Sequence, residues 1–159
     1  MPKLVLDLKD RRPAWSMPGW VEDEIRAALP DGWVLHVMET EADGSGDGMA
    51  NLSPQLVEAV RDAEIYLGYG VPAALLREGN ALRWVHSGAA GVGGSLGPEM
   101  LASPVLFTNS KGIHGPPIAD TVLAMILYFA RGLDLGLANQ ARGIWDQDPF
   151  YRADHPLVE

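Results

Sequence analysis

The most informative segment of this 159-residue chain is LRWVHSGAAGVGGSLGPEMLASPVLFTN, residues 82–109. Its apolar runs at residues 82–86 and 105–108 have the length of buried strands. Between the two runs lie a glycine-rich loop at residues 87–94 and a short predicted helix at residues 98–102. A strand, a helix and a second strand in this order are typical of a parallel sheet.

The residues before this segment show the same alternation. Apolar runs predict three earlier strands, at residues 4–8, 33–37 and 64–67. Helices are predicted after each of them, at residues 20–29, 54–62 and 72–77. Ser53 is placed to cap the second helix with its hydroxyl oxygen. The alternation predicts an α/β fold with a doubly wound parallel sheet of about five strands.

Two other segments have a distinct character. Residues 39–49 contain four acidic residues and three glycines, so we expect an exposed, mobile loop there. Residues 118–130 are apolar on nearly every helical face, which predicts a long helix buried on all sides. Arg131 and Gly132 end or kink that helix, and a second helix is predicted at residues 133–141.

Composition excludes several classes of function. The chain has 12 basic and 21 acidic residues, and a net charge of -9 repels both nucleic acid and anionic membrane surfaces. It has no cysteine, and its histidines lack metal-ligand spacing, so we expect neither a disulfide nor a metal site. The longest apolar run is far shorter than the roughly 20 residues that cross a bilayer. Without a recognisable signal peptide, a soluble cytoplasmic protein is expected.

Ligands of parallel sheets bind beyond the carboxyl ends of the strands, which directs attention to the loops there. These loops are predicted at residues 7–10, 68–70, 87–94 and 109–114. The glycines of the third loop allow its backbone amides to approach an anion closely, although a tight structural turn would use them equally well. The loop is not a dinucleotide fingerprint, because the third glycine position falls on Leu96.

Two side chains near these loops are candidates for ligand contact. His114 precedes the long apolar helix, where its imidazole could hydrogen-bond a substrate oxygen or only cap the turn. Tyr69 lies between Gly68 and Gly70, where its hydroxyl could face a ligand or its ring could pack over the sheet. The residues alone leave both pairs of alternatives open.

LRWVHSGAAGVGG at residues 82–94 and VLFTNSKGIHGPPIADTVLAMILYFARGL at residues 105–133 resemble the D-isomer-specific 2-hydroxyacid dehydrogenase family, specifically its N-terminal substrate-binding domain. The resemblance implies a flavodoxin-like substrate-binding domain, here residues 1–115. It also implies hinge helices at residues 116–145, and a tail at residues 146–159 that leads toward an absent Rossmann-type cofactor domain.

The same resemblance implies roles for particular residues. The amides of Ala90, Gly91 and Val92 would surround the substrate carboxylate. Tyr69 and Gly70 would border the pocket, and His114 would contact the substrate. Two departures from the family pattern are Gly93, where an aspartate is usual, and the pair Asp120-Thr121, where Glu-His or a similar pair is usual.

The resemblance further implies an NAD- or NADP-dependent reaction on a small 2-hydroxy or 2-oxo acid. The catalytic His, Glu and Arg of the family all follow its cofactor fingerprint, so no catalytic or cofactor-binding residue is assigned in this chain. We therefore expect the segment to bind NAD or NADP at most weakly and to be inactive alone. The apolar hinge helix, if uncovered, predicts a homo-oligomer formed through the hinge helices.

A different class of function remains open, a stand-alone carboxylate-binding or regulatory module without catalysis. A receiver domain, one version of it, requires a phosphate-accepting aspartate at the end of the third strand. The chain has Leu67-Gly68-Tyr69-Gly70 at that place, which argues against a receiver domain.

Overall fold

The computed structural model describes residues 1–42 and 52–151 of the chain. The chain divides into two compact units, Met1–Gly112 and Ile113–Glu159. Most of the predicted acidic loop, residues 43–49, lies outside the described residues.

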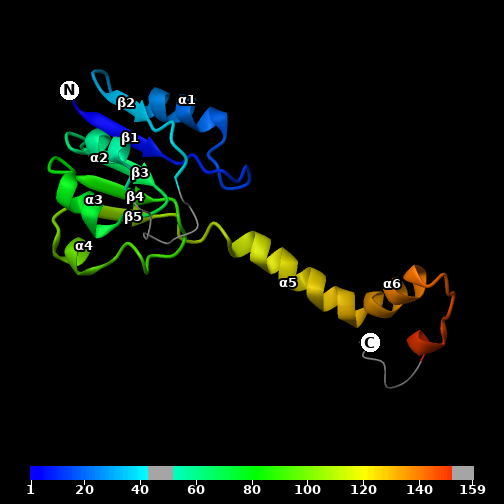
Figure 1. Ribbon diagram of the computed structural model, residues 1–159. Coiled ribbons are helices and arrows are strands. Elements are labelled where there is room, and N and C mark those ends of the chain that lie inside the picture. The colour runs from blue at the N-terminus through cyan, green and yellow to red at the C-terminus, as the bar shows by residue number, and fades with distance from the viewer. Residues whose placement is uncertain (43–51, 152–159) are drawn as a thin grey trace. The chain divides into compact units, whose positions relative to one another are not determined.

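The first unit contains a five-stranded, entirely parallel sheet, whose arrows all point the same way in Figure 1. Its strands are β1 (Lys3–Asp7), β2 (Val34–Val37), β3 (Ile65–Gly68), β4 (Trp84–Ser87) and β5 (Leu106–Asn109). The strand order is β2-β1-β3-β4-β5, the order of flavodoxin-like sheets. The predicted fold class is therefore confirmed.

Four helices connect the strands: α1 (Gly19–Ala28), α2 (Pro54–Val60), α3 (Ala73–Glu78) and α4 (Pro98–Ala102). The Ser53 hydroxyl accepts a hydrogen bond from the Leu56 amide at 3.1 Å, as expected of an N-cap, and Pro54 opens α2 where no amide hydrogen is needed. The bounds of α4 agree with the prediction.

The core of this unit lies against the middle strands. Val5, Tyr66 and Val85 occupy paired positions on β1, β3 and β4, and all three are buried. Leu56 from α2 and Leu75 from α3 belong to the same buried cluster. Burying one such aliphatic side chain contributes roughly 1.5–3 kcal/mol. This packing holds the sheet in place and with it the carboxyl ends of its strands.

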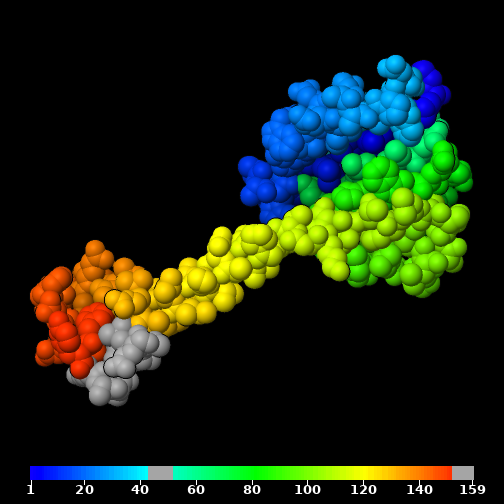
Figure 2. Space-filling model, turned by 180° about the vertical axis from the view of Figure 1, so that it is seen from behind, coloured from blue at the N-terminus to red at the C-terminus, as the bar shows by residue number. Residues whose placement is uncertain are grey.

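The second unit contains α5 (Gly115–Ala130), α6 (Leu133–Ala141) and a 3-10 turn, η1 (Asp148–Tyr151). The axes of α5 and α6 differ by 70°, and Gly132 takes the left-handed φ of 63° at the break between them. The side chain of Phe150 in η1 lies near Gly136 of α6, and Figure 2 shows the two segments side by side.

The predicted burial of the hinge helix is not found. No residue of α5 is buried in the structure as described, and Phe129, for example, is 60% exposed. Within the second unit, α6 is the helix that packs against α5, and it covers only part of its surface. The apolar sequence correctly predicts a helix here, but it does not identify a segment that covers it.

The part of the chain described here has no single helix long and apolar enough to cross a bilayer, and α5 and α6 meet that measure only when they are taken together as a bent pair.

Candidate functional site

Four strands of the first unit end at paired positions, so their carboxyl ends form one edge of the sheet. Asp7, Gly68, Ser87 and Asn109 are the last residues of β1, β3, β4 and β5, and each is paired with its neighbour across the sheet. The loops that leave this edge are those in which a ligand site is expected for such a sheet.

The glycine loop, residues 88–94, starts in close contact with the neighbouring strands. The Gly88 amide donates to the Gly68 carbonyl at 2.7 Å. A Cβ atom at Gly88 would lie 3.1 Å from Cδ2 of Leu8, so a larger residue here would require the Leu8 side chain to shift slightly. Gly93 differs, because a Cβ atom there would meet nothing within 4 Å.

Two buried serines hold the ends of the glycine loop to the segment after β3. The Ser87 hydroxyl donates to the Tyr69 carbonyl at 3.1 Å and accepts from the Ala89 amide at 3.3 Å. The Ser95 hydroxyl accepts from the Val71 amide at 3.1 Å. Because both serines are almost fully buried, these bonds are shielded from water and restrain the loop at both ends.

The middle of the loop presents free hydrogen-bond donors. Among the described residues, no acceptor receives the backbone amides of Ala90, Gly91 or Val92. Gly91 and Val92 are exposed, and Ala90 is half-buried. Consecutive amides without acceptors are partial positive charges that can bind an anion without a cationic side chain.

Asn109 reaches the same loop from β5. Its side-chain amide donates to the Ala90 carbonyl at 2.8 Å. The following amide, of Ser110, donates to the carbonyls of Ser87 at 3.1 Å and of Ala89 at 3.3 Å. The end of β5 is therefore bonded to the glycine loop through both side chain and backbone.

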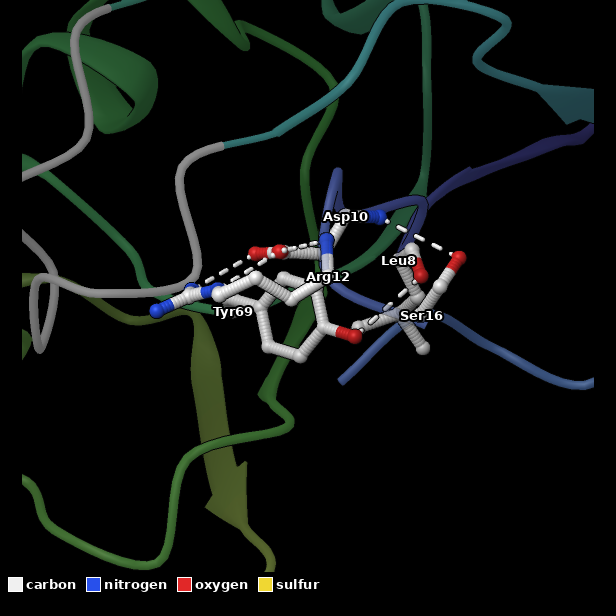
Figure 3. A network of polar contacts seen from close by, with 5 residues as sticks. All are labelled: Leu8, Asp10, Arg12, Ser16 and Tyr69. Carbon is white, nitrogen blue, oxygen red and sulfur yellow. Dashed lines mark hydrogen bonds and ion pairs between the residues drawn. The ribbon is translucent and has the colours of Figure 1, made fainter. Parts of the chain in front are cut away.

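Tyr69 directly follows β3, and its side chain contacts the loop after β1 (Figure 3). Its hydroxyl donates to the Leu8 carbonyl at 3.2 Å, so its donor hydrogen is already used within the protein. Burial, assisted by the negative charge of Asp10, raises the pKa of the Tyr69 phenol above its ordinary value. The neutral hydroxyl can still accept a hydrogen bond from a ligand.

The loop after β1 is held by an ion pair that Figure 3 also shows. The Arg12 guanidinium donates from Nε and Nη2 to the two carboxylate oxygens of Asp10, each at 2.8 Å. The Arg12 backbone amide donates to the same carboxylate at 2.8 Å, and the Asp10 amide donates to the Ser16 hydroxyl at 3.2 Å. Bidentate geometry around a buried carboxylate gives this loop a defined shape.

A buried carboxyl group marks the end of β1. Asp7 accepts a hydrogen bond from the Tyr66 hydroxyl at 3.2 Å. Burial raises the pKa of Asp7 to about 6, although the hydrogen bond from Tyr66 partly offsets this effect.

Polar side chains are linked by hydrogen bonds on the face of β4 and β5 that lies opposite Val85. The Trp84 indole donates to the Thr108 hydroxyl at 2.8 Å, and Nδ1 of His86 lies 2.9 Å from the same oxygen. Nε2 of His86 lies 3.3 Å from the Ser110 hydroxyl. Burial lowers the pKa of His86, which favours the neutral imidazole.

Of the residues predicted from the sequence, five lie on adjacent loops of the first unit: Tyr69, Gly70, Ala90, Gly91 and Val92. His114 belongs to the second unit, where it is the N-cap residue of α5 and its side chain makes no capping hydrogen bond. Ser87, Ser95 and Asn109 were not among the residues predicted for the site. Polar residues at the strand end and at the loop boundary are the signal that could have identified them.

The described residues offer neither a cluster of metal ligands nor a helix N-terminus at the glycine loop. No group of three or more potential metal ligands occurs in residues 1–42 and 52–151. The amides of the glycine loop do not open a helix, because α4 starts only at Pro98 and is five residues long. A dinucleotide pyrophosphate binds at a helix N-terminus, so these residues do not form such a cradle.

Solved structures with a similar fold were found, although no protein-family model or curated protein matched. A D-isomer specific 2-hydroxyacid dehydrogenase family protein from Aeromonas salmonicida subsp. salmonicida A449 superposes with a TM-score of 0.60 and 22% identity, over 91% of this chain and 41% of that chain.

Two further solved structures are similar. An acyclic imino acid reductase in complex with NADPH and D-Arg has a TM-score of 0.63 and 10% identity, over 94% of this chain and 44% of its own. An NAD-dependent formate dehydrogenase from Staphylococcus aureus in complex with NAD has a TM-score of 0.58 and 10% identity, over 93% and 44%. This chain thus spans about two fifths of the length of each. At these identities the similarity establishes the fold that the sequence resemblance implied.

Proposed function

We propose that the chain is the substrate-binding portion of an NAD(P)-dependent D-2-hydroxyacid dehydrogenase or 2-oxoacid reductase. The residues of the glycine loop and the start of α5 carry the sequence resemblance, and solved oxidoreductases share the fold. The ligand is a small 2-hydroxy or 2-oxo acid whose carboxylate binds to the amides of Ala90, Gly91 and Val92.

The observation that carries this proposal is the run of three amides at the carboxyl edge of the sheet that have no acceptor among the described residues. A carboxylate offers two oxygens that each accept short, charge-assisted hydrogen bonds. The net charge of -9 disfavours anions over long distances, but salt screens that repulsion beyond about 8 Å at physiological ionic strength. Local amides can therefore determine binding.

Other residues have supporting roles in the proposal. In the proposal, Tyr69 and Gly70 border the substrate, and the Tyr69 hydroxyl can accept a hydrogen bond from a substrate hydroxyl. His114 is a substrate-contact candidate on the sequence resemblance alone. No residue of this chain is proposed as the catalytic acid or base.

NAD or NADP supplies or accepts the hydride in the proposed reaction. Since the described residues do not form a dinucleotide cradle, we assign the cofactor to a domain outside them. The 159-residue chain alone is then expected to bind the acid but to catalyse no hydride transfer.

Calorimetric titration tests the binding proposal. The chain is titrated with sodium glyoxylate, with sodium hydroxypyruvate and with hydroxyacetone, which lacks the carboxylate, in a buffer of constant ionic strength. Saturable binding of the two acids without binding of hydroxyacetone supports the proposal. Equal responses to all three compounds, or none up to tens of millimolar, contradict it.

A further inference from the structure

We infer that Asn109 is the positioning residue of the anion site, because its side chain fixes the direction in which the Gly91 amide points. The inference rests on the proposed function, since it assigns the orientation of the carboxylate-binding amides to a residue outside the glycine loop.

The geometry of one peptide group carries the argument. The Ala90–Gly91 peptide is planar and trans, so the Ala90 carbonyl and the Gly91 N–H point in opposite directions. The Asn109 side chain donates to that carbonyl at 2.8 Å. Holding the oxygen toward β5 therefore turns the Gly91 hydrogen away from β5, to the exposed side of the loop.

Nothing else in the described residues fixes this peptide. The Asn109 side chain is the one donor there that reaches the Ala90 carbonyl, and Gly91 belongs to no helix or strand. Glycine also has the widest choice of backbone angles, so rotation of this peptide meets little steric resistance. Without Asn109, the peptide can turn its carbonyl outward, where it would repel a carboxylate.

Asn109 itself is well anchored. It is the last residue of β5, its Cα is paired with Ser87, and the next amide bonds to two carbonyls of β4 and its loop. A side chain on a strand end places a donor more accurately than one on a loop does. Ala90 and Asn109 are 19 positions apart in the sequence, and the pairing of β4 with β5 brings them together.

Two variants remove the donor in different ways. Asn109→Ala truncates the side chain, and Asn109→Leu keeps its approximate volume if the smaller residue unfolds the protein. The control is Ser103→Ala, since the Ser103 hydroxyl bonds a backbone amide, that of Val105, at the opposite end of β5. Each ¹⁵N-labelled protein is titrated with sodium glyoxylate while the amide resonances of residues 90–92 and the thermal unfolding midpoint are measured.

The inference predicts at least a fivefold weaker affinity for glyoxylate in both Asn109 variants and a displaced Gly91 resonance in the unliganded protein. Ser103→Ala should retain wild-type affinity even where its unfolding midpoint falls equally. Wild-type affinity and an unmoved Gly91 resonance in the Asn109 variants overturn the role of Asn109 while the proposed function stands. Failure of the wild-type protein to bind contradicts the proposed function and this inference with it.

Discussion

The Tyr66 hydroxyl donates a hydrogen bond to the Asp7 carboxylate across 3.2 Å, at the buried junction of β1 and β3. This single bond does not replace the hydration that the carboxylate loses, so the pKa of Asp7 rises from its ordinary value of 3.8 to about 6. The folded protein therefore binds the proton more tightly than the unfolded chain does.

This shift predicts a particular pH dependence of stability. The stabilisation from the protonated group is complete below pH 3.8 and is lost as the pH rises through 6. The loss is about 3 kcal/mol by the linkage between pKa and free energy. Asp7→Asn, which is neutral at all pH values and can accept from Tyr66, should be more stable than wild type at pH 7, and this advantage should shrink toward pH 4.

Urea unfolding at pH 4, 5, 6 and 7 measures that difference, with the exposed Asp31→Asn as the control. A free-energy difference between wild type and Asp7→Asn that stays constant over this range would falsify the assignment of the shift to Asp7.

Gly88 and Gly93 of the glycine loop should respond differently to substitution. Gly88→Ala places a methyl group 3.1 Å from the end of the Leu8 side chain, which must shift slightly, so a loss of about 1 kcal/mol of stability is expected. Gly93→Ala meets nothing within 4 Å and should change stability by less than about 0.5 kcal/mol. Chemical denaturation of both variants tests the pair, and equal losses would show that the contact with Leu8 is not limiting.

Ser87 should matter for both stability and binding. Ser87→Ala removes the donor to the Tyr69 carbonyl and the acceptor for the Ala89 amide, leaving two polar groups with fewer partners. The expected loss of stability is about 1–3 kcal/mol. Because the start of the glycine loop is released, affinity for glyoxylate should also fall severalfold. Unfolding and calorimetry together check this, and retained affinity in a destabilised variant would remove Ser87 from the account of the site.

The exposed apolar surface of α5 predicts self-association, in line with the homo-oligomer expected from the sequence. Val122, Ile126 and Phe129 lie on one face of the helix and are 49%, 59% and 60% exposed. Sedimentation velocity should detect dimers or larger species at micromolar concentration. Ile126→Glu should weaken the association at least tenfold, and Ala124→Glu, on the opposite face, much less. A wild-type protein that sediments as a monomer at 100 µM would rule out this association.

Local sequence patterns predicted most of the fold. Apolar spacing located every strand within a few residues, Ser53 was identified as a cap, and the bounds of α4 and α6 agree with the prediction. Such features depend on neighbours in the chain, which the sequence displays directly.

The interior of the site depends on pairing between distant strands, and this limited the prediction. Asp7 meets Tyr66 across 59 positions because β1 pairs with β3, and Ser95 meets Val71 across 24 positions where the loops after β3 and β4 lie together. Sequence patterns indicated a glycine loop with free amides, but not that Asn109 holds one of its carbonyls. The expected burial of α5 was wrong for a related reason, since apolarity does not specify a partner.

A crystal structure of the chain with hydroxypyruvate tests the central claim most directly, which is that the glycine loop binds the carboxylate of a small 2-oxo acid. The account predicts carboxylate oxygens within about 3.2 Å of the amide nitrogens of Ala90, Gly91 and Val92. A carboxylate bound elsewhere on the chain, with these amides facing only solvent, would contradict it.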